Sequence, residues 1–386
     1  MNIQVPNDTT AEERLEIVVS ADRLAEVESA WMHLWHRSEG LIFQSHGWVS
    51  AWWATVADRD QRALRIGLVW KRDGLVAVLP LAIGRRKGLR FLEWAASSYP
   101  DSGDMLVAPE CSDAALQGLW TKISASGGFD LVYLNRILPD AAVRKLLGQA
   151  TSGGVNVRPN HREEVSYRVA GGWESGAAWL ASQSKKTRKN YRRSIKLMEE
   201  SGELKFRMLS DDEPLQPVLE RLSELKRQWL AQHTRESDLF DEGANVLAGL
   251  VDALARTGVL RIFVLECNGV LIAVSINFVQ RGTMMAFVTT YDPEFSRASP
   301  GVVLMIDYIQ WSIDHGLKMV DFLCGAEPFK HKFATQGVTL QSVLGTRTLK
   351  GSLVYFGDRI RQKLHGMRDR RQAASSPVEN DDDADA

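Results

Sequence analysis

The residues best suited to chemistry in this chain lie at the start of a predicted helix in its second half. Ser299 suits the N-cap position, and Pro300 suits the first helical position, where its missing N–H costs nothing. The next amides, at Gly301 and Val302, are expected to lack partners within the helix, and Gly301 has no side chain to obstruct a ligand. Such a helix end binds phosphate, so with Arg297 it forms a predicted diphosphate site. Ordinary helix capping is the alternative interpretation.

Ionisable side chains follow two neighbouring predicted strands. Tyr291 ends the strand that precedes the helix, and Asp321 lies on the strand that follows it. Glu327 and Lys330 come in the loop after Asp321, beyond the carboxyl end of that strand, where chemistry is often placed. Asp321 as a structural ion-pair partner and Lys330 as a solvated surface charge are the alternatives. The order of the parts favours a functional site, because a phosphate-binding helix end and an acid-base cluster both follow adjacent strands.

A third feature is the basic run SKKTRKNYRRS at residues 184–194, on a predicted helix. Its cations occupy nearly every side of that helix, and a solvated surface is one interpretation. The other interpretation is that Lys185, Lys189 and Arg192 bind an anionic substrate. That substrate is either the diphosphate of a nucleotide-sugar or lipid-linked sugar, or the backbone of a tRNA.

Composition excludes several function classes. The chain has 386 residues, 45% of them hydrophobic and 25% charged, which allows two globular domains. Its net charge of -1 gives no general attraction to nucleic acid or anionic membranes. The three cysteines and eight histidines have no metal-ligand spacing, so no metal is expected. We expect a cytoplasmic protein with no export signal and no membrane span, which leaves room for peripheral membrane contact only.

The predicted elements fall into two similar halves. Each has a strand, two helices, several mostly antiparallel strands, a helix and a strand, and a polar linker at about 153–174 separates them. Asn268-Gly269 and Arg281-Gly282 are predicted hairpin turns. Four segments are therefore predicted: domains at 1–160 and 175–350, a basic amphipathic helix at 351–372, and a disordered acidic tail at 373–386.

The order strand, two helices, three antiparallel strands, phosphate-binding helix, strand resembles the GNAT (N-acetyltransferase) fold. Tyr291-Asp292, Ser299-Pro300-Gly301, Asp321-Phe322 and the run GAEPFK at 325–330 resemble motifs of the CelD/BcsL-type acetyltransferases, which carry a BioF2-like acetyltransferase domain. That family is similar in turn to the Fem-type peptidyltransferases. The resemblance covers about residues 175–350 and implies an α/β (α+β) protein with tandem GNAT-like domains, each a mixed, mostly antiparallel sheet flanked by helices.

The resemblance also implies acyl transfer to the nitrogen or oxygen of a sugar or an envelope precursor, as in exopolysaccharide and cellulose production. The donor is expected to be acetyl-CoA or another acyl-CoA, and the acceptor a small-molecule or lipid-linked sugar. The pyrophosphate loop departs from the GNAT pattern, because Pro300 and Val302 occupy its glycine positions.

Roles for the candidate residues follow. Asp321 or Glu327 is the expected base, Lys330 stabilises negative charge or holds an acceptor phosphate by analogy with a lysine of the Fem-type enzymes, and Tyr291 protonates the thiolate. Two alternatives stay open. One is a Fem-like transferase that uses aminoacyl-tRNA, and the other is a non-catalytic scaffold of polysaccharide synthesis.

Overall fold

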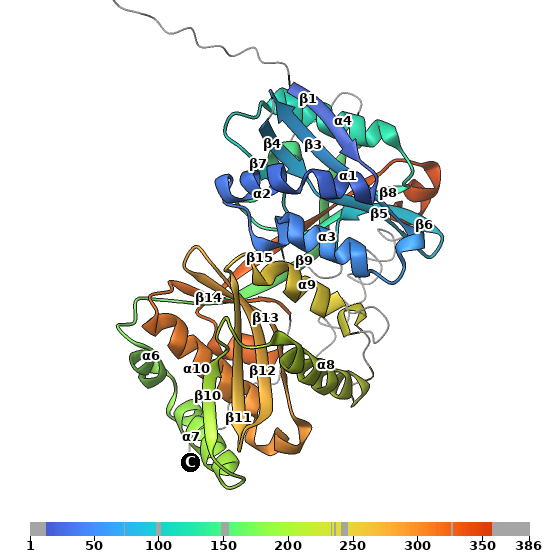
Figure 1. The fold of residues 1–386 in the computed structure, drawn as a ribbon. Coiled ribbons are helices and arrows are strands. Elements are labelled where there is room, and N and C mark those ends of the chain that lie inside the picture. Colours follow the sequence, from blue (N-terminus) through green and yellow to red (C-terminus); the bar gives the residue numbers. More distant parts are fainter. Residues whose placement is uncertain are drawn as a thin grey trace, which may run out of the picture.

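The structure is a computed structural model that describes residues 13–72, 74–97, 102–147, 154–232, 234, 237–240, 246–325 and 327–356. Figure 1 shows two lobes, with the N-terminal half above and the C-terminal half below. Strands β9 and β15 lie between them.

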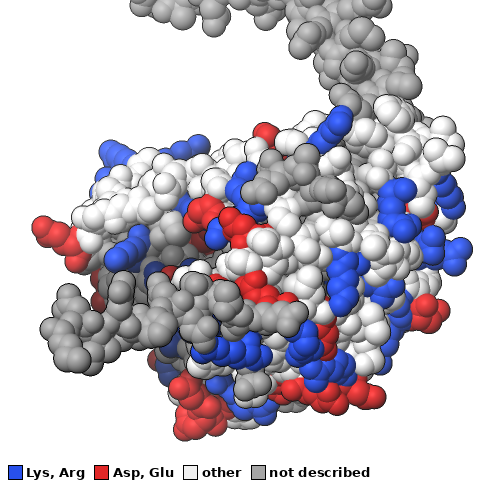
Figure 2. All heavy atoms as spheres, turned by 90° about the horizontal axis from the view of Figure 1, so that it is seen from above, with Lys and Arg blue, Asp and Glu red and all other residues white. Residues whose placement is uncertain are grey.

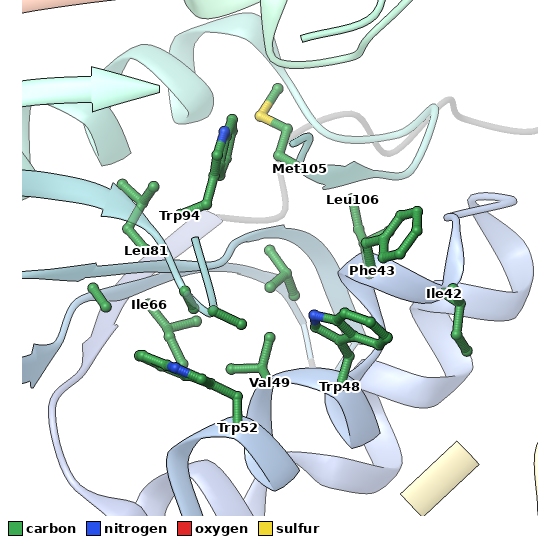
Figure 3. Packing of buried hydrophobic residues seen from close by; sticks show 14 of the residues in the cluster. Ile42, Phe43, Trp48, Val49, Trp52, Ile66, Leu81, Trp94, Met105 and Leu106 are labelled. Carbon is green, nitrogen blue, oxygen red and sulfur yellow. The ribbon is translucent and has the colours of Figure 1, made fainter. Parts of the chain in front are cut away.

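The N-terminal half has a small sheet, in the order β1-β3-β4-β7, against which α2 and α4 pack. Its helices bury a dense aromatic core in which Phe43 and Trp48 meet edge to face (Figure 3). Its elements are β1 (Glu13–Val18), α1 (Ala21–Glu26), α2 (Glu28–Arg37), η1 (Ile42–Gln44), α3 (His46–Thr55), η2 (Arg59–Gln61), β2 (Arg62–Leu64), β3 (Ile66–Lys71), β4 (Gly74–Leu79), β5 (Leu81–Arg86), β6 (Leu89–Trp94), β7 (Leu106–Val107), α4 (Asp113–Ser126), β8 (Leu131–Ile137) and α5 (Arg144–Leu147).

The second half follows the predicted order. The hairpin turns at Asn268-Gly269 and Arg281-Gly282 are confirmed, with positive φ at all four residues. The elements are β9 (Val157–Ala170), α6 (Gly176–Ser182), α7 (Lys185–Glu199), β10 (Leu204–Met208), α8 (Leu215–Gln232), η3 (Asp238–Phe240), α9 (Val246–Ala255), β11 (Leu260–Cys267), β12 (Val270–Gln280), β13 (Thr283–Tyr291), η4 (Pro293–Ala298), α10 (Pro300–Asp314), β14 (Met319–Cys324), α11 (Pro328–Phe333) and β15 (Gln336–Thr346).

The predicted linker at 153–174 is wrong for most of its length. It contains β9, which pairs with β14 on one side and β15 on the other, and β15 in turn pairs with β8. A single sheet therefore crosses both halves in the order β10-β11-β12-β13-β14-β9-β15-β8-β6-β5-β2 among the described residues. Most residues of β9 are half-buried or exposed, and its polar sequence lacks the apolar alternation that identifies a strand.

Helices cover both faces of this sheet in the C-terminal half. Strand β11 is apolar on both sides, since Ile262 and Val264 join the large core shared with the N-terminal half, while Phe263 and Leu265 join the core under α10. Helices α8 and α9 lie on the first face, and α6, α7 and α10 lie on the second.

The C-terminal segment is described only in part. Residues 349–356 are helical, whereas the remainder of the basic helix predicted at 351–372 and the whole tail predicted at 373–386 lie outside the described residues. In the part of the chain that the structure describes, no helix combines the length and apolarity needed to cross a bilayer. Figure 2 shows acidic and basic side chains interspersed over much of the N-terminal end.

Candidate active site

Strands β13 and β14 diverge and open a cavity in the sheet. They pair in parallel only from Thr283↔Met319 to Met285↔Asp321, although β13 continues to Tyr291. The cavity beyond the last pair has a volume of about 370 Å³. Its walls come from β13, α10, β14, α8, η3, α11 and the residue before α11, with these lining residues: Lys226, Trp229, Phe240, Ala286, Phe287, Val288, Thr289, Thr290, Tyr291, Gly301, Val302, Met305, Tyr308, Phe322, Glu327, Phe329 and Lys330.

A β-bulge distorts the strand that forms one wall. Ile276 of β12 lies opposite Val288, but the next residue, Asn277, lies opposite Ala286, so Phe287 is an extra residue on β13. Bulges of this kind occur often beside active sites because they redirect the strand. No local pattern in the sequence indicates this bulge.

The helix start differs in detail from its prediction. Ser299 adopts a left-handed conformation (φ 51°, ψ 55°), and its side chain does not cap α10. Its carbonyl oxygen instead accepts hydrogen bonds from the amides of Val302 (3.0 Å) and Val303 (3.3 Å). The Val302 amide is therefore already bonded, which leaves Gly301 as the predicted diphosphate-binding amide. Arg297 and Ser299 are exposed beside the cavity-lining residues.

Gly301 and Tyr291 are in contact at the N-terminus of α10. A Cβ added at Gly301 would lie 3.1 Å from Cδ1 of Tyr291, so the tyrosine ring packs directly against the helix start. Both residues line the cavity. A larger residue at position 301 would displace the ring or project into the cavity.

Lys330 is buried and held in place by two acceptors. Its Nζ donates to the carbonyl oxygen of Cys324 at 2.6 Å and lies 3.1 Å from Oε2 of Glu327, whose side chain is half exposed. Glu327 is the N-cap residue of α11, a helix that the sequence did not indicate. Gly325 permits this close arrangement, because its φ of 139° favours glycine and a Cβ there would lie 2.2 Å from Oε2 of Glu327.

Asp321 lies outside this cavity and lines a separate one, of about 420 Å³, between the two halves. Its Oδ2 accepts from Nε of Arg168 at 2.8 Å, and its Oδ1 accepts from the hydroxyl of Ser166 and from the amide of Leu323 at 2.8 Å. Leu323 has a φ of 58°, an unusual conformation for a leucine. Asp321 therefore ties β14 to β9 and stabilises a strained turn.

We expect Asp321→Asn to lower the free energy of unfolding by about 1–3 kcal/mol, because Arg168 loses its largely buried counter-ion. Urea denaturation followed by circular dichroism measures the change. Glu26→Gln removes an exposed ion pair with Arg23 and is the control, with an expected loss under about 1 kcal/mol. Equal, small losses in both variants would contradict a structural role for Asp321.

Sequence reasoning missed the wall formed by α8 and η3. Trp229 and Phe240 line the cavity on the side of the sheet opposite α10. Thr290 also lines it, and within the described residues its buried hydroxyl has no hydrogen-bond partner. A ligand in the cavity would satisfy that hydroxyl.

Helix α7 carries the predicted basic surface. Lys185, Lys189 and Arg192 are exposed and form no ion pair with the described residues. The hydroxyl of Tyr191 donates to Asp307 of α10, which fastens α7 beside the helix that lines the cavity. Burial raises the pKa of the Asp307 carboxyl to about 6.

Comparison with known proteins defines the class. Residues 185–331 match the family model described as an acetyltransferase (GNAT) domain. A search of curated proteins found no match. No group of three or more potential metal ligands gathers within the described ranges.

Several solved structures share the fold. FemX aligns over 86% of this chain and 96% of its own, with 11% identity and a TM-score of 0.54. The C-terminal domain of a putative lysylphosphatidylglycerol synthetase from Agrobacterium fabrum aligns over 87% of this chain and 96% of its own, with 12% identity and a TM-score of 0.53. L-PGS from Bacillus licheniformis aligns over 85% and 93%, with 13% identity and a TM-score of 0.53. At these identities the likeness is one of fold.

The predicted fold class, α/β with tandem GNAT-like domains of mixed sheets flanked by helices, is confirmed. Residues 185–331 form a GNAT-type acetyltransferase domain, and the protein is of the acyltransferase class.

Proposed function

We propose that this protein transfers an acyl group, most simply acetyl, from acyl-CoA to a nitrogen or oxygen of a sugar or an envelope or exopolysaccharide precursor, as in the CelD/BcsL-type enzymes. One observation carries the proposal. The cavity between β13 and β14 brings the start of α10 and the Glu327–Lys330 pair to the same space.

The residues at the cavity fit an acyl-CoA donor. Gly301 offers a helix end to a diphosphate without a side chain in the way, and Arg297 and α7 add positive charge nearby. Phe287, Val288 and Met305 supply apolar walls for the arm that carries the thioester. Beyond Met285 and Asp321, where β13 and β14 no longer pair, their facing edges offer backbone groups to an extended amide-containing arm.

The proposed mechanism is direct transfer. Acyl-CoA supplies the activated carbonyl group. Glu327, which is half exposed, takes a proton from the attacking amine or hydroxyl, and Lys330 stabilises the negative charge that develops on the carbonyl oxygen. Tyr291 donates a proton to the departing thiolate. We do not assign the role of base to Asp321, because its two carboxylate oxygens accept hydrogen bonds from Ser166 and Arg168 outside this cavity.

Acetyl-CoA is expected to raise the melting temperature of the protein, because a ligand that binds only the folded state stabilises it. In Gly301→Val the stabilisation should fall severalfold, since the added side chain meets Tyr291 at the cavity mouth. Differential scanning fluorimetry measures both. Gly172→Ala, where no atom lies within 4 Å of the added Cβ, is the control. Equal shifts in wild type and Gly301→Val would place the donor elsewhere.

The exposed cations of α7 favour a second candidate, a Fem-like transfer from aminoacyl-tRNA. Their spacing along one exposed helix suits a phosphodiester backbone as well as an acceptor diphosphate. A rise in the melting temperature with tRNA, and no rise with acyl-CoA, would favour this candidate over the first. The hypothesis of a non-catalytic scaffold requires that Asp321, Glu327 and Lys330 form one internal ion-pair network with no cleft beside it. Asp321 and Lys330 instead line separate cavities, which disfavours that hypothesis.

Charge reversal on α7 tests acceptor binding. Lys189→Glu with Arg192→Glu should raise KM for a phosphorylated acceptor about tenfold or more and leave KM for a neutral acceptor unchanged. The control is Lys205→Glu with Arg256→Glu, which makes the same change in net charge at exposed sites outside α7. An equal rise in both double variants would indicate a long-range effect of net charge.

A further inference from the structure

Exposed apolar side chains concentrate in one short helix. Of the six large hydrophobic residues that are exposed in the described part of the chain, four lie in the helical segment 349–356. Leu349, Leu353 and Phe356 are 86%, 75% and 59% exposed, and their spacing of four and three residues places them on one helix face. A single exposed apolar residue is ordinary, whereas a cluster of this kind marks an interaction surface.

The orientation of this helix is fixed at its start. The Thr348 hydroxyl donates to Oδ1 of Asp130 at 2.9 Å and accepts from the amide of Gly351 at 3.1 Å, as an N-cap residue does. Gly351 packs so closely that an added Cβ would lie 2.3 Å from the carbonyl oxygen of Asp130. The apolar face therefore points away from a rigid support.

A basic hairpin contacts this helix. Nζ of Lys350 donates to the carbonyl oxygen of Gly88 at 2.7 Å, in the turn between β5 and β6. That hairpin presents Arg85, Lys87 and Arg90 to solvent. Figure 1 shows the red helical segment next to β6, and in Figure 2 basic side chains line the right-hand edge, the side on which Figure 1 places that strand.

The sequence after this helix continues the same chemistry. Residues 357–371 contain six Lys and Arg against two Asp. Ile360, Leu364 and Met367 extend the apolar spacing that begins with Leu349, Leu353 and Phe356. A basic sequence with apolar residues at this spacing is typical of segments that lie on membrane surfaces.

We propose that Leu349, Leu353 and Phe356, together with the basic β5–β6 hairpin, form a docking face for an anionic lipid bilayer. The apolar side chains enter the interface, and the flanking Lys and Arg meet the lipid phosphates. A second copy of the chain is a poorer occupant, because it would bring two basic surfaces together. Docking there would bring the transferase to substrates held at a membrane.

Flotation of the full-length protein with lipid vesicles tests this docking face. Vesicles containing phosphatidylglycerol should bind the wild type, and vesicles of phosphatidylcholine alone should bind it weakly. Leu353→Ser with Phe356→Ser should weaken binding to anionic vesicles at least about tenfold, since it removes two apolar side chains from the contact. Arg85→Glu with Lys87→Glu should weaken it about as much, and added salt should weaken wild-type binding.

The control is Val19→Ser with Val270→Ser, which removes two exposed apolar side chains elsewhere and should leave vesicle binding unchanged. The proposal is overturned by absence of binding to anionic vesicles or by equal binding of Leu353→Ser with Phe356→Ser. Two further outcomes also overturn it. In the first, the wild type is a dimer that does not bind vesicles, and Leu353→Ser with Phe356→Ser is a monomer. In the second, this variant has a lowered melting temperature, which would show that the chain covers this face itself.

Discussion

Lys330→Met is expected to lower turnover by about a hundredfold or more, because it removes the charge that the proposed mechanism places against the developing oxyanion. Methionine is of similar length and volume to lysine, so the local fold should persist even though the carbonyl oxygen of Cys324 loses the hydrogen bond from Lys330. The measurement is the rate of thiol release from acyl-CoA with an acceptor that the wild type uses.

Lys332→Met is the matched control, since Lys332 is exposed on the same short helix and lies over the ring of Phe333. Its turnover should stay within about twofold of the wild type. If Lys330→Met is folded and equally active, Lys330 has no part in the chemistry. If Lys330→Met were active and Glu327→Gln inactive, Glu327 would keep its proposed role as base and Lys330 would have no role in the reaction.

Gly325→Ala should be nearly as damaging, although no atom of Gly325 is proposed to react. The added methyl group would lie 2.2 Å from Oε2 of Glu327 and 2.6 Å from Nζ of Lys330, closer than non-bonded atoms approach. Its φ of 139° is also strained for any residue with a Cβ. Both catalytic candidates must therefore move, and we expect a loss of about a hundredfold in turnover with unchanged far-ultraviolet circular dichroism.

Gly172→Ala provides the control for that substitution, because its Cβ meets no neighbour and its φ is ordinary. It should leave turnover unchanged. Full activity of Gly325→Ala would mean that the observed spacing of Glu327 and Lys330 is unimportant for the reaction. The result also separates position from charge, since Gly325→Ala preserves both ionisable groups whereas Lys330→Met removes one.

Local signals in the sequence determined much of this fold. Strands β11, β12 and β13 and their two glycine turns were predictable, because short apolar runs and the turn residues that bound them act over a few positions. Pro300 and Gly301 likewise marked the start of α10. The order of these elements was enough to indicate the GNAT-like class.

Tertiary structure alone decided which residues meet. Asp321 and Lys330 are close in sequence, yet Asp321 bonds Arg168 of β9 on one side of the strand while Lys330 turns back to the carbonyl oxygen of Cys324 at the cavity. Strand β9 is a strand only because β14 and β15 supply its hydrogen-bond partners. Such long-range pairings depend on contacts between distant segments, and a sequence pattern that acts over a few residues has no means of specifying them.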